Sequence, residues 1–195
     1  MCIRDSPMST SAPALDHDAV VADTVHWLEK AVIGLNLCPF AKAVHIKKQV
    51  RYVVCEATTP EALLEKLMEE LEHLAEADPE KLDTTLIIHP HVLKDFEDYN
   101  EFLDVADAAL EDMDLDGILQ VASFHPYYQF ADTDKNDIEN YTNRTPYPTL
   151  HLLREESIDR AVEAFPEASE IFEKNMDTIR ALGHDGWDKL MADKA

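Results

Sequence analysis

Two histidine-proline pairs each follow a run of apolar residues in this chain of 195 residues. The first run is followed by His89, Pro90 and His91, and the second by His125 and Pro126. Short apolar runs are typical of buried strands, and proline terminates a strand because it cannot donate to the ladder. Imidazole can act as a general acid or base near neutral pH, and it also binds zinc, iron, copper and nickel. The histidines are therefore candidates for chemistry.

His89 and His91 are two residues apart, so their side chains would point the same way if the chain is extended there. Together with His125 they could act as catalytic residues, or they could bind a divalent transition metal that keeps an open coordination position. A purely structural role is the third interpretation, because His-x-His is a pattern of low specificity. The sequence leaves these three alternatives open.

Acidic residues are absent from four segments, 38–55, 84–94, 117–131 and 140–154, although the chain carries 40 acidic and only 17 basic residues. The same segments hold seven lysines and arginines and five of the nine histidines. Burial alone would exclude basic residues as well as acidic ones. The pattern therefore indicates a neutral-to-basic cleft for a small anionic molecule. Basic side chains that extend from strand edges into solvent are the alternative.

Candidate ligand-binding residues follow from the same pattern. The arginine guanidinium offers a planar fork that fits a carboxylate or phosphate, so we expect Arg144 and Arg154 to bind the anion. Asn143 and His151 add polar groups close to them in sequence. The intervening loop, residues 131–147, is longer than most connections in compact domains, and we expect it to close over the ligand.

The chain contains three cysteines, Cys2, Cys38 and Cys55, and no C-x-x-C pair, which favours a reducing, cytoplasmic location. Cys38 is a further candidate ligand-binding residue, with core packing as the alternative. The net charge of −23 disfavours binding to nucleic acids and to anionic membrane surfaces. No apolar stretch is long enough to span a membrane, and neither a glycine-rich phosphate loop nor a serine hydrolase motif occurs.

Hydrophobic periodicity predicts the elements that position these residues. The alternation of strands and helices predicts a single small α/β domain, 16–195, with about four strands in a mixed, mostly parallel sheet flanked by helices. A ferredoxin-like α+β fold is the alternative, and residues 1–15 are predicted to be a disordered arm. His89 and His125 would then share the carboxyl edge of the sheet. The expected strands are 52–56, 84–89, 118–124 and 149–154, and the expected helices are 16–35, 58–78, 96–116, 157–165 and 167–182.

Four motifs in this order resemble a bacterial family known as domain of unknown function 1415: GLNLCPFA, LIIHPHVLKDFEDYNEFL, QVASFHPYYQF and NYTNRTPYPTLHLLREES. The likeness extends from about Trp27 to Phe165. It implies that the candidate residues belong to the family's signature, and it assigns no activity or cofactor.

The residues themselves lead us to expect an enzyme that acts on a small anionic metabolite, with the histidines as acid-base groups or metal ligands. A non-catalytic binding or regulatory module is the alternative. Such a module would use the same pocket, or it would dock a protein through Tyr127, Tyr128 and Phe130.

Overall fold

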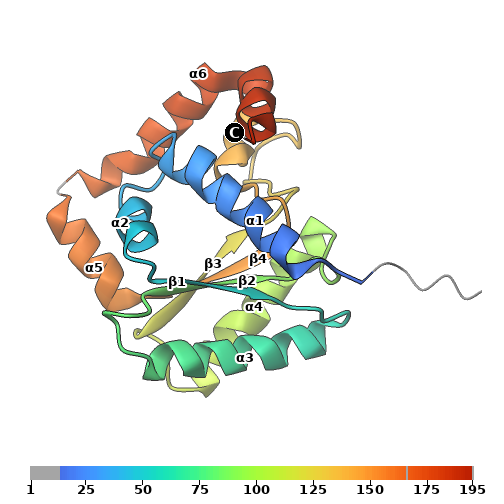
Figure 1. The fold of residues 1–195 in the computed structure, drawn as a ribbon, viewed down its shortest axis with the longest axis vertical. Helices are drawn as coiled ribbons and strands as arrows, with labels where there is room; N and C mark the ends of the chain where they lie inside the picture. Colours follow the sequence, from blue (N-terminus) through green and yellow to red (C-terminus); the bar gives the residue numbers. More distant parts are fainter. Residues whose placement is uncertain (1–13, 166, 195) are drawn as a thin grey trace, which may run out of the picture.

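A four-stranded sheet separates two helical layers in this computed structural model, which describes residues 14–165 and 167–194 (Figure 1). The strand order is β1-β2-β4-β3. β1 and β2 pair in parallel, and β4 lies antiparallel between β2 and β3. The predicted α/β class with a mixed sheet is confirmed, whereas the predicted arm lies outside the described residues apart from residues 14 and 15. The strands are β1 (Val50–Val54), β2 (Thr84–Ile88), β3 (Leu119–Phe124) and β4 (Thr149–Arg154).

Two of the helices begin at caps that the sequence supplies. The Thr59 side chain accepts a hydrogen bond from the backbone N–H of Ala62 at the start of α3. The Asp95 side chain accepts from two backbone N–H groups at the start of α4. The helical segments are α1 (His17–Trp27), the π-helix η1 (Leu28–Ile33), α2 (Ala41–Ile46), α3 (Pro60–Glu76), α4 (Phe96–Asp112), the 3-10 helix η2 (Ile138–Asn143), α5 (Glu155–Ala164), the 3-10 helix η3 (Ala168–Glu170) and α6 (Ile171–Ala192).

Some element predictions were wrong. The helix expected over 157–165 begins two residues earlier, since α5 starts at Glu155, and the Ser157 hydroxyl donates to Asp83 at 2.5 Å instead of capping a helix. The helix end expected after residue 182 is present: Gly183 takes a positive φ of 66° with a ψ of 175°, which breaks α6 into two helical parts, and Trp187 is buried in the second part. The short helix α2 was not predicted.

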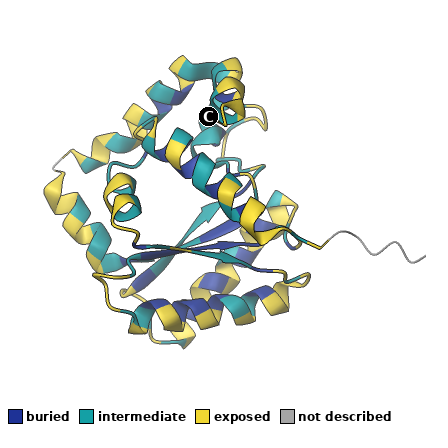
Figure 2. Ribbon diagram, in the orientation of Figure 1, coloured by how far each residue is buried: buried dark blue, intermediate teal, exposed yellow. Residues whose placement is uncertain are grey.

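The sheet divides the core into two parts, and buried positions line the sheet-facing sides of α3 and α4 (Figure 2). This first cluster is rich in fully buried leucines, and it fills the space between the sheet and the two helices. The second cluster packs α1 and η1 against α6 through Trp27, Ala31, Ile179 and Trp187. This second cluster contacts the sheet through Tyr52 of β1 and Phe124 of β3, and the rest of this face of the sheet borders a cavity.

Candidate functional site

The carboxyl ends of β1, β2 and β3 lie at one edge of the sheet, where His89 and His125 are both fully buried. Each ring bonds to the loop between β2 and α4. His89 donates from Nδ1 to the carbonyl of Val92 at 3.0 Å, and His125 donates from Nε2 to the carbonyl of Leu93 at 3.0 Å. Since the backbone N–H of Tyr127 donates to Nδ1 of His125 at 3.0 Å, the proton of that ring is assigned to Nε2. The two histidines thus hold backbone in place.

Tyr99 of α4 lies against both rings, with its centroid 5.8 Å from that of His89 and 4.9 Å from that of His125. Its hydroxyl donates to the carbonyl of Thr149 at 2.7 Å and accepts from the N–H of Phe124 at 3.1 Å. Burial in this aromatic cluster lowers the pKa of His89 to about 4, and it also lowers the pKa of His125. Both rings are therefore neutral at neutral pH, and both nitrogens of His125 are already used.

His91 does not point with His89. It is exposed, because the chain forms a turn at residues 90 and 91 instead of staying extended. Within residues 14–165 and 167–194, no group of three or more His, Cys, Asp or Glu side chains is arranged to hold a metal ion. The structure therefore does not bring His89, His91 and His125 together as a metal centre.

Arg154 lies at the other end of β4, far along the strand from the histidine edge, and it is only 8% exposed. Its guanidinium donates to the carbonyls of Leu74 at 2.7 Å, Ala77 at 3.0 Å and Leu82 at 3.0 Å. These carbonyls lie at and just beyond the end of α3, where a helix leaves acceptors unpaired. Arg154 therefore stabilises a helix end, and it does not meet Arg144 at a shared anion site.

Arg144 precedes β4, and its hydrogen bonds stabilise the loop 131–147. It donates to the carbonyls of Tyr128 at 3.1 Å and Lys135 at 2.6 Å, and its guanidinium lies 4.4 Å from the ring centre of Tyr141. The loop is not a structureless lid, because it contains the 3-10 helix η2. Like Arg154, Arg144 uses its donors on backbone carbonyls.

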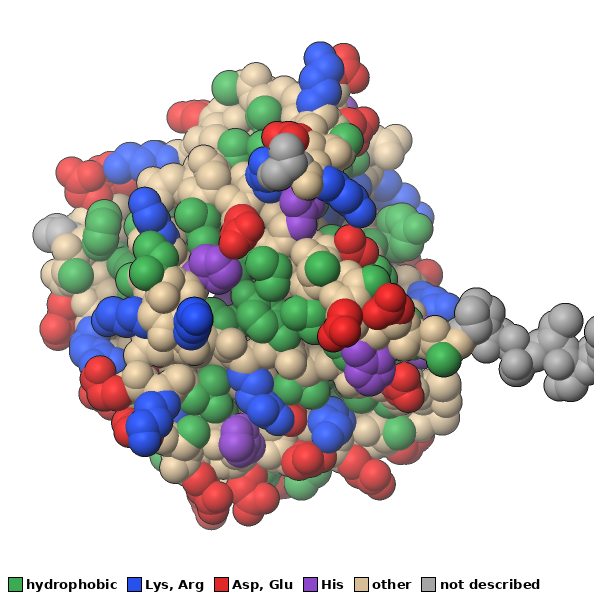
Figure 3. Space-filling model, in the orientation of Figure 1, with side chains coloured by type: hydrophobic (Ala, Val, Ile, Leu, Met, Phe, Trp, Pro, Cys, Tyr) green, Lys and Arg blue, Asp and Glu red, His purple; other side chains and the backbone are tan. Residues whose placement is uncertain are grey.

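A cavity of about 460 Å³ lies over the face of the sheet that is turned away from α3 and α4. α1, η1, α2, α5 and α6 form its walls. In the view of Figure 3, in which the sheet is seen edge-on, apolar side chains gather near the middle of the surface, with charged side chains around them. All four strands contribute to its floor. The floor residues are Val50, Thr84, Leu86, Gln120, Ala122, Phe124, His151 and Leu153.

His151 occupies the centre of this floor, between Leu86 of β2 and Ala122 of β3. Its Nε2 lies 2.7 Å from the hydroxyl oxygen of Thr84, and that hydroxyl donates to the carbonyl of Leu152 at 2.6 Å. Because the hydroxyl proton is used on the carbonyl, Thr84 accepts from Nε2–H, which assigns the lone pair of the ring to Nδ1. Burial lowers the pKa of His151 to about 4, so the ring is neutral at neutral pH.

Three of the predicted ligand-binding residues, Cys38, Asn143 and His151, line the cavity, whereas Arg144 and Arg154 do not. Among the described residues that line it, Asp83 is the one charged side chain. Gln120, Ala122 and Thr84 were not predicted from the sequence. Strand alternation was the available signal, since it places them on the same face as His151 once the pairing is known.

The π-helix η1 covers part of the cavity with Leu28 and Val32. The widened turn is visible in the bond from the N–H of Gly34 to the carbonyl of Glu29, five residues earlier, at 2.9 Å. A Cβ atom at Gly34 would collide with the carbonyl oxygen of Lys30, so this turn requires glycine. π-Helical turns are frequent at functional sites, which agrees with the position of η1 beside the cavity.

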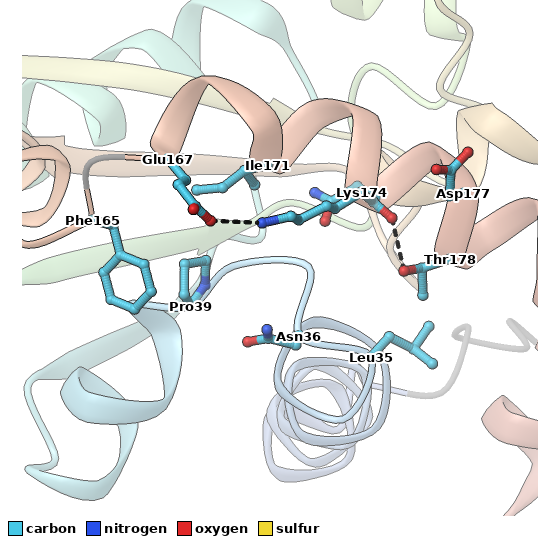
Figure 4. A pocket seen from close by; sticks show the side chains of 10 residues that line it. Leu35, Asn36, Pro39, Phe165, Glu167, Ile171, Lys174, Asp177 and Thr178 are labelled. Atoms are coloured by element: carbon cyan, nitrogen blue, oxygen red, sulfur yellow. Dashed lines mark hydrogen bonds and ion pairs between the residues drawn. The ribbon is translucent and has the colours of Figure 1, made fainter.

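A second, outer cleft of about 450 Å³ lies between the chain that precedes α2 and the start of α6 (Figure 4). Lys174 forms an ion pair with Glu167 at 3.2 Å there, and the Thr178 hydroxyl donates to the carbonyl of Lys174 at 2.8 Å. Asn175 belongs to both cavities and donates to the carbonyl of Leu37 at 2.8 Å. Because Lys174 pairs with Glu167 and Asp177 pairs with Arg180 of the same helix, the charged groups of the outer cleft already have partners, and the inner cavity is the better candidate site.

The fold and the site define an α/β protein with a mixed four-stranded sheet and an apolar cavity across one face of that sheet. A family model described as "Protein of unknown function (DUF1415)" matches residues 19–189, and the chain belongs to this family. The match includes both histidine-proline motifs and the whole cavity floor. No curated protein and no solved structure matches the chain. In the part of the chain that the structure describes, no helix is long and apolar enough to cross a membrane.

Proposed function

We propose that the protein binds a small, uncharged and mainly apolar molecule in the cavity over the sheet. One observation carries this proposal: all four strands contribute apolar side chains to the cavity floor, while a neutral histidine lies at its centre. Pockets that hold small molecules have volumes of roughly 300–1,000 Å³ and are mostly apolar with a few polar groups. The cavity of about 460 Å³ fits this description.

An anionic ligand has less support. Arg144 and Arg154 donate to backbone carbonyls, and Asp83 would repel an anion that entered the cavity. The enzymatic alternative with His89, His91 and His125 stays a prediction, since two of these rings bond to backbone and the third is exposed. A cytoplasmic location is part of the proposal, and the free thiols of Cys38 and Cys55 support it.

The experiment fills the cavity and measures binding of the neutral fluorescent probe N-phenyl-1-naphthylamine. Ala122→Phe places a ring beside His151, whereas Ala108→Phe adds the same ring at an exposed position of α4, on the other side of the sheet. We expect saturable binding by the wild type and by Ala108→Phe. For Ala122→Phe we expect an affinity about tenfold or more lower, equivalent to ~1.4 kcal/mol, because the added ring occupies space that the probe needs.

Circular dichroism and urea unfolding show whether both variants are folded. Probe binding that does not saturate in the wild type would overturn the proposal. Equal affinity of folded Ala122→Phe and Ala108→Phe would also overturn it, because the probe would then occupy another surface.

A further inference from the structure

We infer that His151 selects the ligand by accepting a hydrogen bond, so that the preferred ligand is an apolar molecule with one hydroxyl or N–H donor. This inference rests on the proposed function, and it adds the chemical class of the ligand. It depends on three features of the floor: the assigned tautomer of His151, the absence of a partner for its second nitrogen, and the neutral surroundings of the ring.

Thr84 holds the tautomer. The chain of bonds runs from Nε2–H of His151 to the Thr84 oxygen and from the Thr84 hydroxyl to the carbonyl of Leu152. If the ring proton moved to Nδ1, the single Thr84 proton would be used on Nε2, and the Thr84 oxygen would lie 2.6 Å from the Leu152 carbonyl oxygen with no proton between them. Thr84 is only 5% exposed, so water has little access to replace the lost bond. The lone pair is therefore kept on Nδ1.

Nδ1 has no hydrogen-bond partner among the described residues, although His151 lies deep in the protein. Part of the ring surface can still be reached, because it borders the cavity. Ala122, directly opposite on β3, is small enough to leave space beside the ring. A ligand that donates to Nδ1 would satisfy this acceptor, whereas one that lacks a donor would displace water without replacing its bond.

The residues around His151 also disfavour a charged ligand. The ring is neutral at neutral pH, and no lysine or arginine is among the described residues that line the cavity. A carboxylate would therefore lose its hydration without gaining a cation. Gln120 lies diagonally from His151 on the same face, and its amide can bond to the oxygen of a bound hydroxyl.

Three naphthalene probes of the same shape test the inference: 2-naphthol, 2-methoxynaphthalene and 2-naphthoate. We expect the wild type to bind 2-naphthol about tenfold more tightly than the ether, since one net hydrogen bond in a dry site contributes ~1.4 kcal/mol, and to bind the carboxylate most weakly. His151→Phe keeps an aromatic ring but removes the acceptor, and it should reduce the preference for 2-naphthol over the ether to about twofold or less.

Thr84→Val is the second variant, and it leaves His151 in place. Without the hydroxyl the ring is free to carry its proton on Nδ1, so the preference for the donor probe should be lost or reversed. Imidazole nitrogen NMR reports the tautomer directly, and it should show a shift of the proton from Nε2 in the wild type towards Nδ1 in Thr84→Val. This readout keeps the inference testable if His151→Phe does not fold.

The possible outcomes distinguish failure of the inference about His151 from failure of the proposed function. If the wild type binds 2-naphthol and the ether with equal affinity, the inference is overturned and the proposed function stands. Tightest binding of 2-naphthoate would overturn the inference and favour an anionic ligand. If none of the three probes binds, the proposed function and the inference are both overturned.

Discussion

Acidification should destabilise the fold through His89 and His151. Burial lowers the pKa of each ring from the usual 6.5 to about 4. In the unfolded chain both rings would bind a proton near pH 6.5, so between pH 6.5 and pH 4 the unfolded state binds more protons than the folded state. The free energy of unfolding contributed by these rings is therefore fully present above pH 6.5, and it is lost as the pH falls through this window.

The expected loss of unfolding free energy follows from how far burial lowers the pKa of each ring. One unit of pKa corresponds to ~1.4 kcal/mol, so each ring would remove ~3 kcal/mol of stability by pH 4. At pH 5 the folded rings are still mostly neutral and the unfolded rings mostly charged, which gives a loss of ~2 kcal/mol for each ring relative to pH 7.5.

Urea unfolding at pH 7.5 and pH 5 measures this loss in the wild type and in two variants without a titrating group. His89→Asn can still donate to the carbonyl of Val92, and His151→Gln can still donate to Thr84. On acidification each variant should lose ~2 kcal/mol less than the wild type, because it lacks one of the two rings. Titration of the many carboxylates affects every chain alike, so it cancels in this comparison.

His91→Asn, at an exposed position in the same loop, is the matched control and should follow the wild type. Curves of stability against pH that run parallel for the wild type, His89→Asn and His151→Gln would refute the reasoning. The rings would then be hydrated in the folded protein, and the neutral cavity floor would be an incorrect description.

The remaining predictions separate structural side chains from ligand-binding ones. Arg154→Met should lower the free energy of unfolding by ~3 kcal/mol in urea, because three carbonyls at and beyond the end of α3 lose their donor, and Arg154→Lys should recover part of that loss. Arg144→Met should accelerate hydrogen exchange in residues 131–147, because the loop loses two hydrogen bonds. The affinity for N-phenyl-1-naphthylamine should stay within about twofold of the wild type. A large loss of affinity would show that Arg144 contributes to ligand binding. His125→Leu should lower stability by ~2 kcal/mol, since two backbone bonds are lost, and calorimetric titration should show unchanged probe binding.

The strand edge that carries His89 and His125 was predictable from the sequence. Helical connections make successive strands run in the same direction, so their carboxyl ends meet. The structural role of these two histidine rings was not predictable. Their hydrogen bonds to the carbonyls of Val92 and Leu93 depend on the turn that the loop adopts after Pro90.

The segments without acidic residues have a physical explanation that differs from an anion site. Arg154 and Arg144 satisfy buried or half-buried backbone carbonyls, which a guanidinium can do and a carboxylate cannot. Arg51 donates at 2.8 Å to Glu70, which lies outside those segments. For the three arginines the bias thus reflects which groups need a donor, whereas the four lysines of these segments are exposed to solvent: Lys42, Lys47, Lys48 and Lys94.

The cavity could be predicted only in part. Alternation places Gln120, Ala122 and Phe124 on one face of β3, and His151 was recognised as a candidate. The space above them depends on how α1, η1 and α6 pack with one another and against the sheet, where the Trp27 ring contacts Phe124. Such packing between distant segments leaves no local pattern in the sequence.

A crystal structure of the protein with 2-naphthol tests the central claim most directly. We expect the probe inside the cavity between the sheet and η1, with its hydroxyl about 2.7–2.8 Å from Nδ1 of His151. A structure at a saturating concentration of the probe that shows the cavity filled by its own side chains, with 2-naphthol bound elsewhere, would contradict it.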